Sequence, residues 1–194
     1  MEKRRIVLAS KSPRRIQLLE ENGVDAICIP SNVEEIIPEE LTAPDEICEY
    51  LACLKGEWVA SRCEEGDIVI SADTVVHCRG ELLGKPRDKE DARRMLSLLS
   101  GSRHYVLTGM CIIGNGKKVV ESVSTEIVFK ELTSEEIEEY ISSDEPYDKA
   151  GGYGIQETAG GFVKEINGDF DNVVGLPVTR LLEILRDEFS CSVN

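Results

Sequence analysis

Along the first half of this chain, short runs of apolar residues alternate with longer stretches in which apolar residues recur every three or four positions. The short runs are typical of buried strands, and the longer spacing is typical of helices that bury one face. Pro13 suits the first position of a helix that Ser12 caps, and Gly23 suits its end. This pattern predicts strands over 4–9, 24–29 and 67–78, helices over 13–22 and 88–99, and a further helix that opens at 42–45.

The second half of the chain breaks this alternation with two long strand-like segments. Residues 103–113 and 117–129 flank the sequence Gly114-Asn115-Gly116, which favours a β-hairpin. Alternation followed by a hairpin predicts an α/β fold with a mixed, elongated sheet and flanking helices. The remaining predicted elements are a helix that begins with a capping box at 133–136, a strand over 162–166 and a helix over 176–189.

Length, hydropathy and charge narrow the class of protein. The chain has 194 residues, which suits one domain or two small lobes around one site. No apolar run approaches the roughly 18 residues of a membrane helix, and the apolar stretch near the start is too short for a signal peptide, so the expected location is cytoplasmic. The net charge of −15 argues against a general nucleic-acid or membrane surface, because both need a basic face.

Cysteine and histidine counts remove further classes of protein. The seven cysteines include no C-x-x-C pair and only two histidines are present, which argues against a Cys/His zinc site. Without a secretory signal, the cysteines are expected to be reduced thiols. No serine lies in a G-x-S-x-G frame, which argues against a serine hydrolase of that kind.

The first candidate for chemistry is the predicted strand-to-helix turn at residues 10–15. Two serines, one lysine and two arginines gather there, and a helix N-terminus favours an anion. The segment therefore predicts a phosphate or carboxylate cradle. A capped helix with solvent-facing arginines would have the same sequence.

Asp73 is the second candidate, because Ser71 to Thr74 interrupt an otherwise apolar strand. An ionised carboxylate flanked by isoleucine and valine is costly unless it is paired, hydrogen-bonded or metal-bound. Asp73 is therefore predicted to ligate a metal or to act as a general base for a water molecule. The alternative is an aspartate at a strand end that binds a neighbouring turn.

Two later segments carry weaker signals. The segment at 84–87 lacks the spacing of a P-loop, and Pro86 stands where that motif needs serine or threonine, but Lys85 on a rigid turn could still bind a phosphate. Residues 148–156 do not fit G-x-G-x-x-G, yet their glycines predict a tight loop. Gln156 offers that loop a donor and an acceptor for the edge of a base. The alternatives are an exposed turn and a surface loop.

Taken in order along the chain, three blocks resemble the Maf family, whose members are nucleoside triphosphate pyrophosphatases. The blocks are LASKSPRR at 8–15, SADTV at 71–75 with GKPR at 84–87, and DKAGGYGIQ at 148–156 with NVVGLP at 172–177. They span nearly the whole chain, so the resemblance implies a single Maf-like domain over residues 1–194. It also implies a fold like that of inosine triphosphate pyrophosphatases, with two lobes around a cleft.

The resemblance implies a role for each candidate residue. Asp73 matches the family's proton acceptor for the attacking water. The residues that match base-selecting positions, in the combination of the dTTP/UTP subgroup, are Arg14, Thr74 and Gln156. The residues expected to bind phosphates are Ser10, Ser12, Arg15, Lys55 and Lys85. A divalent cation, Mg²⁺ or Mn²⁺, is expected at Glu35 and Asp73.

Alternatives to this assignment stay open. A nucleotide-binding regulatory protein of cell division, without significant catalysis, would use the same basic pocket but would not need Asp73. A Maf enzyme for 7-methyl-GTP or CTP is a second alternative, because Glu157 and residues 169–171 depart from the family pattern near the base-reading loop. An acidic interaction protein would leave the clustered cations unexplained. The expected partner is a small nucleotide, not a nucleic acid or a membrane, and a homodimer fits the habit of the family.

Overall fold

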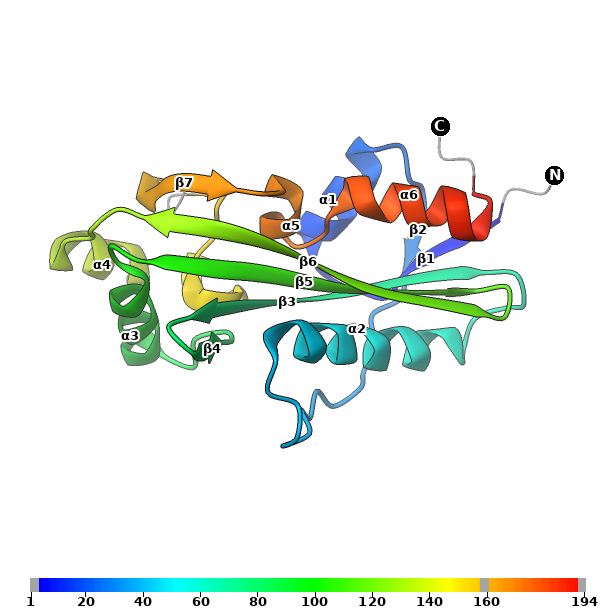
Figure 1. The fold of residues 1–194 in the computed structure, drawn as a ribbon, viewed down its shortest axis with the longest axis horizontal. Coiled ribbons are helices and arrows are strands. Elements are labelled where there is room, and N and C mark those ends of the chain that lie inside the picture. The colour runs from blue at the N-terminus through cyan, green and yellow to red at the C-terminus, as the bar shows by residue number, and fades with distance from the viewer. Residues whose placement is uncertain (1–3, 158–160, 192–194) are drawn as a thin grey trace. The chain divides into compact units, whose positions relative to one another are not determined.

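The computed structural model describes residues 4–157 and 161–191 (Figure 1). The chain forms two compact units. Unit 1 comprises Met1–Asp73, Thr108–Val123 and Gly175–Asn194, and unit 2 comprises Thr74–Leu107 and Ser124–Val174. Two units agree with the predicted two lobes. The cleft between the lobes and the single domain stay predictions.

Unit 1 is built on parallel strands with helices on both faces. β1 (Ile6–Leu8) pairs in parallel with β2 (Ala26–Cys28) and with β3 (Ile68–Cys78). Figure 1 shows α2 on one face of this sheet and α1 with α6 on the other. These helices are α1 (Pro13–Glu21), α2 (Pro44–Ala60) and α6 (Val178–Phe189). One buried cluster of the unit consists of Val7, Ala9, Val59 and Val69.

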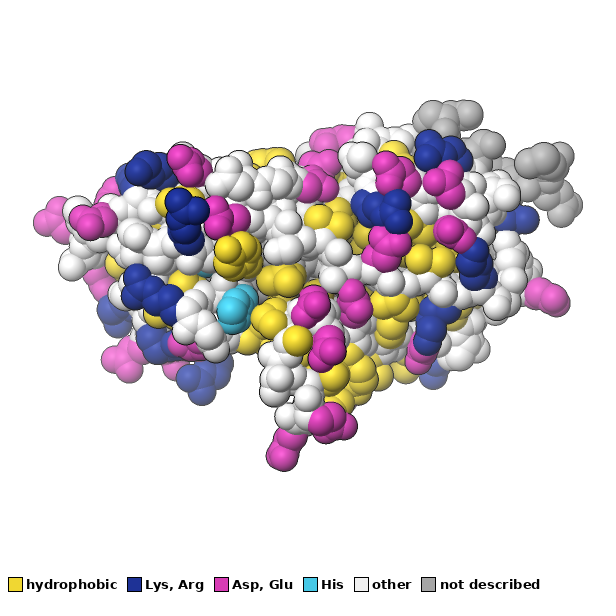
Figure 2. Space-filling view, viewed as in Figure 1, with side chains coloured by type: hydrophobic (Ala, Val, Ile, Leu, Met, Phe, Trp, Pro, Cys, Tyr) yellow, Lys and Arg dark blue, Asp and Glu magenta, His cyan; other side chains and the backbone are white. Residues whose placement is uncertain are grey.

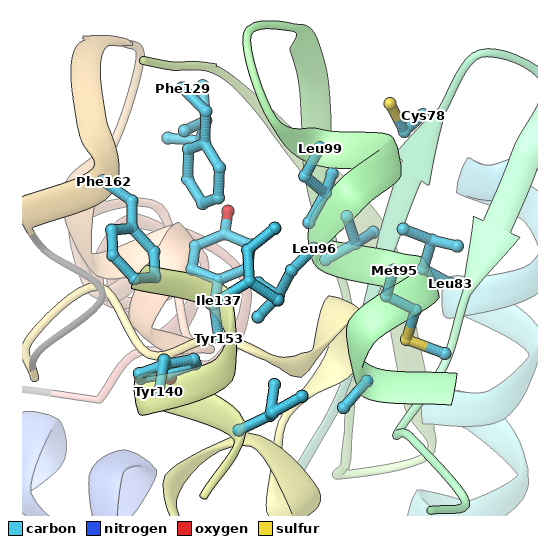
Figure 3. Close-up of a cluster of buried hydrophobic side chains, with 14 of the residues drawn as sticks. Cys78, Leu83, Met95, Leu96, Leu99, Phe129, Ile137, Tyr140, Tyr153 and Phe162 are labelled. Atoms are coloured by element: carbon cyan, nitrogen blue, oxygen red, sulfur yellow. The ribbon is translucent and has the colours of Figure 1, made fainter. Parts of the chain in front are cut away.

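Unit 2 has a core rich in aromatic side chains. Figure 3 shows Phe129, Tyr140, Tyr153 and Phe162 gathered in this core. The ring centroids of Phe129 and Tyr153 lie 4.8 Å apart in an edge-to-face arrangement, which the ring quadrupoles favour. Among the described residues, the following elements lie wholly within unit 2: β4 (Glu81–Leu83), α3 (Lys89–Leu99), α4 (Ser134–Ile141), two 3₁₀ turns (Glu145–Asp148 and Ala150–Gly152), β7 (Val163–Asn167) and α5 (Phe170–Val174).

Three long strands, β3, β5 (Arg103–Gly114) and β6 (Lys117–Phe129), each contribute residues to both units. The strand order is β2-β1-β3-β5-β6-β7, with β4 paired to β3. The β3–β4 and β6–β7 pairs are antiparallel, so the predicted mixed sheet with flanking helices is confirmed. The predicted hairpin is confirmed as well, because Asn115 and Gly116 join β5 to β6 with φ of 52° and 72°, as a type I′ turn requires.

The strand predicted over 67–78 is confirmed as β3, which runs without a break through the polar residues 71–74. Its polar side chains find partners on α2. Ser71 Oγ donates to the carbonyl of Ala52, and Asp73 pairs with Lys55. Since these contacts offset the cost of burying polar groups, the strand has no need to end there.

The two predicted helix caps differ in outcome. The capping box of α4 is confirmed, because Thr133 and Glu136 exchange both side-chain-to-backbone hydrogen bonds. Ser12 does precede α1, as predicted, but its side chain makes no capping hydrogen bond. The prediction that Ser12 caps the helix is therefore wrong. Instead, Ser10 Oγ accepts from the Ser12 N–H at 3.1 Å. The two serines thus form a turn of their own before the helix.

Basic and acidic side chains interleave on the surface over α6 (Figure 2). Arg180 contacts Glu121 and Glu183, and Arg186 contacts Asp187. Exposed pairs of this kind contribute at most about 1 kcal/mol each to stability. Within the described ranges, no helix has both the length and the apolar character needed to cross a bilayer.

Candidate functional site

Three of the predicted site residues meet at one ammonium group in unit 1. Lys55 Nζ lies 2.5 Å from Asp73 Oδ1 and 3.0 Å from Glu35 Oε2. The side chains of Lys55 and Asp73 are 13% and 12% exposed, whereas that of Glu35 is 50% exposed. One cation therefore links a nearly buried carboxylate to a solvated one, and water screens the Lys55–Asp73 contact only weakly.

Parallel pairing brings Asp73 to the same edge of the unit 1 sheet as the predicted cradle. The Ala9 N–H donates to the carbonyl of Ile70 at 2.7 Å, just where β1 has ended. From there the chain turns through residues 10–12 into α1, while β3 continues to Asp73. Open α/β sheets hold their ligands beyond the carboxyl ends of the strands. The cradle and the carboxylate therefore lie where a ligand is expected.

Two glycines let α2 approach the sheet closely enough for Lys55 to reach Asp73. A Cβ on Gly109 of β5 would lie 2.4 Å from the backbone carbonyl carbon of Cys48 on α2. A Cβ on Gly56, one residue after Lys55, would lie 2.4 Å from the hydroxyl oxygen of a serine on β3. Any larger side chain would push the helix away from the sheet, because protein interiors are close-packed.

That serine, Ser71, also ties α2 to the sheet through its hydroxyl group. Ser71 Oγ lies 2.7 Å from the carbonyl oxygen of Ala52 on α2 and 3.0 Å from that of Cys111 on β5. The side chain is fully buried. Ser71 has no role among the sequence predictions, although a serine inside a run of isoleucine and valine was a usable signal.

Arg15 of α1 adds a further cation to this region of unit 1. Its Nε donates to the carbonyl of Gly175 at 2.7 Å. Burial lowers the pKa of the Arg15 guanidinium from its ordinary value and the like charge of Arg14 lowers it further, while Asp73 and Glu35 oppose both effects. Because an arginine keeps its charge in proteins, Arg15 acts electrostatically on both carboxylates.

The donors around Lys55 fit a hard divalent cation. Among the residues that the structure describes, no group of three or more His, Cys, Asp or Glu side chains is arranged to hold a metal ion. Asp73 and Glu35 are two carboxylates that already share one positive charge. One or two carboxylates are what Mg²⁺ usually takes when substrate phosphates and water complete its shell, and Mn²⁺ favours the same oxygen ligands.

Unit 2 holds the remaining predicted residues, Thr74, Lys85 and Gln156. Thr74 is partly buried in β3, and Lys85 and Gln156 are exposed. The Gly151 N–H donates to the carbonyl of Gly84 at 2.9 Å, so the segment that carries Lys85 is joined to the loop that carries Gln156. The predicted residues thus fall into two groups, with Ser10, Ser12, Arg14, Arg15, Glu35, Lys55 and Asp73 in unit 1.

Buried polar contacts hold the glycine loop, residues 148–157, in unit 2. Tyr153 Oη lies 2.7 Å from His104 Nε2, and the Gly154 N–H donates to Tyr140 Oη at 3.2 Å. Burial lowers the pKa of His104 to about 4, so its imidazole is neutral near pH 7. None of these three side chains is among the sequence predictions. A tyrosine between glycines was the available signal for Tyr153.

Comparisons with known proteins agree with the sequence blocks. A family model described as Maf-like protein matches residues 5–188. A dTTP/UTP pyrophosphatase of Alkaliphilus metalliredigens is 46% identical over 187 residues, which cover 95% of this chain and 96% of the relative. A dTTP/UTP pyrophosphatase of Bacillus anthracis is 48% identical over 191 residues, which cover 98% of each chain. Among solved structures, the Ham1 protein of Staphylococcus aureus is 18% identical with a TM-score of 0.44, covering 65% of this chain and 72% of that one.

Proposed function

This chain belongs to the Maf family, and we propose that it is a nucleoside triphosphate pyrophosphatase that acts on dTTP and UTP. The observation that carries the proposal is the nearly buried carboxylate of Asp73, held by Lys55 at the edge of the unit 1 sheet. The relatives named dTTP/UTP pyrophosphatase support the choice of substrates, because they match this chain over nearly its whole length.

In the proposed reaction, water attacks the α-phosphorus of the nucleotide, and the bond from that phosphorus to the oxygen bridging the α and β phosphates breaks. The products are the nucleoside monophosphate and pyrophosphate. Asp73 accepts the proton that the attacking water loses. The 2.5 Å contact with Lys55 supports this role, because it orients the carboxylate and keeps a cation close to the reacting phosphate.

Several cations would share the charge of the triphosphate, which is about four negative charges near neutral pH. Arg15 and Lys55 supply two of them in unit 1, the unit that also holds the turn at residues 10–12. The Ser10 and Ser12 hydroxyls add hydrogen-bonding groups at the N-terminus of α1, where the helix dipole favours an anion. Lys85, in unit 2, completes the set that the family resemblance predicts.

Glu35 and Asp73 are the residues that would hold a divalent cation, Mg²⁺ or Mn²⁺. When bound, such a cation neutralises phosphate charge and polarises phosphoryl oxygens. Glu35 suits this role because its carboxylate is half exposed, so it can reach both Lys55 and solvent-borne ligands. Asp73 would contribute an oxygen ligand from a regular strand.

Base selection falls to Arg14, Thr74 and Gln156. Gln156 is exposed at the end of the glycine loop, and its amide can donate to one atom of a base and accept from another. Two hydrogen bonds of opposite direction can separate uracil and thymine from cytosine, whose ring edge carries an amino group in place of a carbonyl. This part of the proposal fits the pyrimidine substrates of the named relatives.

We assign both units to one functional domain, because a single family model spans residues 5–188. The proposed compartment is the cytoplasm, and the proposed partner is the nucleotide, with the chain acting alone or as a homodimer.

The first test is pyrophosphate release by the full-length protein with Mg²⁺ or Mn²⁺, using dTTP, UTP, CTP, ATP, GTP and 7-methyl-GTP. We expect metal-dependent release from dTTP and UTP. Release from CTP or 7-methyl-GTP instead would preserve the reaction but contradict the roles of Arg14, Thr74 and Gln156. No release from folded protein that still binds dTTP would favour the nucleotide-binding regulatory role.

A further inference from the structure

We propose that the ion pair between Lys149 and Glu157 is a clasp that holds the end of the glycine loop, and that this clasp strengthens the discrimination between bases at Gln156. The inference deepens the proposed function and rests on it. Glu157 is a positioning residue in this account, because it acts on the substrate only through the loop that carries Gln156.

Lys149 is a buried lysine whose ammonium group contacts three other residues. Its side chain is 8% exposed, and its Nζ lies 2.9 Å from Glu157 Oε2, 2.7 Å from Asp148 Oδ1 and 2.7 Å from the carbonyl oxygen of Glu145. A buried ammonium is costly unless it is paired and hydrogen-bonded. Asp148 and Glu145 precede Lys149 in the chain, so of these partners only Glu157 ties it to the far end of the loop.

The clasp closes directly over Gly154. A Cβ on Gly154 would lie 2.6 Å from Glu157 Oε2 and 2.6 Å from Lys149 Cε, so both side chains pack against the glycine backbone. The Glu157 N–H also donates to the Gly154 carbonyl at 3.3 Å. The ion pair therefore joins the two ends of the segment 149–157 around a backbone that is already turned.

Gln156 depends on this closure because the two tyrosine anchors of the loop come before it. Tyr153 is held by His104, and the Gly154 N–H is held by Tyr140, but both contacts come before Gln156. Glu157 comes directly after it. An amide that selects a base through hydrogen bonds must be held to within about 0.5 Å of its working position. Gln156 should therefore discriminate between bases better when the loop is anchored both before and after it.

The clasp itself can be tested without a substrate, by amide hydrogen exchange of residues 150–157 in the full-length protein. Glu157→Gln keeps the shape of the side chain and removes its charge. We expect about tenfold faster exchange of the loop in this variant, because local opening becomes easier. Glu138→Gln on α4, which removes exposed ion pairs with Arg93 and Lys89 of α3, is the matched control and should leave the loop unchanged. Equal loop exchange in wild type and Glu157→Gln overturns the inference.

Base discrimination is tested by kcat and KM for UTP and CTP. We expect Glu157→Gln to lower the UTP-to-CTP ratio of kcat/KM about fivefold, mainly through a higher KM for UTP, since substrate must now order the loop. Glu157→Asp keeps the charge and should recover part of the ratio. An unchanged ratio in Glu157→Gln overturns the inference even if the loop exchanges faster. If the wild type hydrolyses neither UTP nor dTTP, the proposed function fails, and the exchange experiment still decides the clasp.

Gly154→Ala opens the clasp from the inside and serves as a second variant. The three atoms nearest to the added methyl group belong to the flexible side chains of Glu157 and Lys149, so the backbone should keep its path while the ion pair separates. We expect the same change in exchange and in the UTP-to-CTP ratio as in Glu157→Gln. The double variant should differ little from either single variant, because both substitutions remove the same ion pair. Additive effects would contradict a shared cause.

Discussion

The two units hold their predicted site residues in different ways. In unit 1, Lys55 and Asp73 project from a helix and a strand that pack against each other through glycine, with Ser71 joining them. In unit 2, Gln156 sits on a loop that depends on side-chain anchors. Side chains on regular elements are held more rigidly than side chains on loops.

This difference indicates where the reaction chemistry and the choice of base are each expected to reside. Proton transfer and charge neutralisation are common to every nucleoside triphosphate, so they suit the rigid cluster of unit 1. Discrimination between bases suits a loop, because a loop can be adjusted without disturbing the core. Substitutions in the cluster of Lys55, Asp73 and Glu35 should therefore affect all substrates alike, and substitutions in the glycine loop should change ratios between substrates.

The largest expected effect tests the chemical role of the unit 1 cluster. Asp73→Asn removes the proposed proton acceptor and keeps the size of the side chain, so we expect kcat to fall about 10³-fold for every substrate, with little change in dTTP affinity. Pyrophosphate release measures the first quantity and calorimetric titration the second. Asp187→Asn, at an exposed ion pair on α6, is the control. Normal turnover in Asp73→Asn would remove Asp73 from the mechanism.

The next effect concerns the stability of unit 2 in acid. Burial lowers the pKa of His104 from 6.5 to about 4. Between pH 6.5 and pH 4, this histidine is therefore protonated in the unfolded chain and neutral in the folded chain. The stability due to this group is present above pH 6.5 and is lost as the pH falls towards 4. We expect the loss to reach about 3 kcal/mol, since one pKa unit corresponds to about 1.4 kcal/mol. Denaturant unfolding of wild type and His104→Gln from pH 7.5 to 4.5 measures it, and parallel pH profiles would contradict it.

A smaller effect tests base reading by the glycine loop. Gln156→Ala removes a donor and an acceptor, and we expect the UTP-to-CTP ratio of kcat/KM to fall about tenfold while pyrophosphate release from CTP changes little. Gln17→Ala on α1, whose exposed amide donates to Glu21, is a matched control. A uniform loss of activity on all substrates would instead place Gln156 with the phosphate-binding residues.

The smallest expected effect tests the support beneath Lys55. Ser71→Ala deletes the hydroxyl that lies within hydrogen-bonding distance of the carbonyls of Ala52 and Cys111, and we expect the free energy of unfolding to fall by about 1–2 kcal/mol. Thermal and denaturant unfolding measure this loss. Ser97→Ala, an exposed serine on α3, should change stability by less than about 0.5 kcal/mol. An equal effect of the two substitutions would show that Ser71 does not support α2.

Local sequence patterns predicted much of the fold. The Asn115-Gly116 hairpin and the capping box at Thr133 depend on residues within a few positions of one another, and both were correct. The strand over 67–78 was correct as well, but the partners of its polar residues were not predicted, because they lie on α2, about 18 residues away in the chain. Contacts at that separation leave no periodic signal.

The same limit applies to the candidate site. Its residues could be proposed from motif order, but their supports could not. His104 and Tyr153 are 49 residues apart and meet only in the core of unit 2. Lys149 and Glu157 are close in sequence, yet their pairing requires the turn at Gly154.

By itself, the sequence determined the types of most elements, the mixed α/β class, the acidic surface and the family to which the chain belongs, because these follow from local pattern, composition and motif order. Tertiary structure alone decided that Ser71 of β3 bonds to α2, that Lys55 bridges Asp73 and Glu35, and that buried polar contacts hold the glycine loop. The physical reason is that a buried polar group is stable only beside its partner, and most of the partners found here are supplied by distant segments when the chain packs.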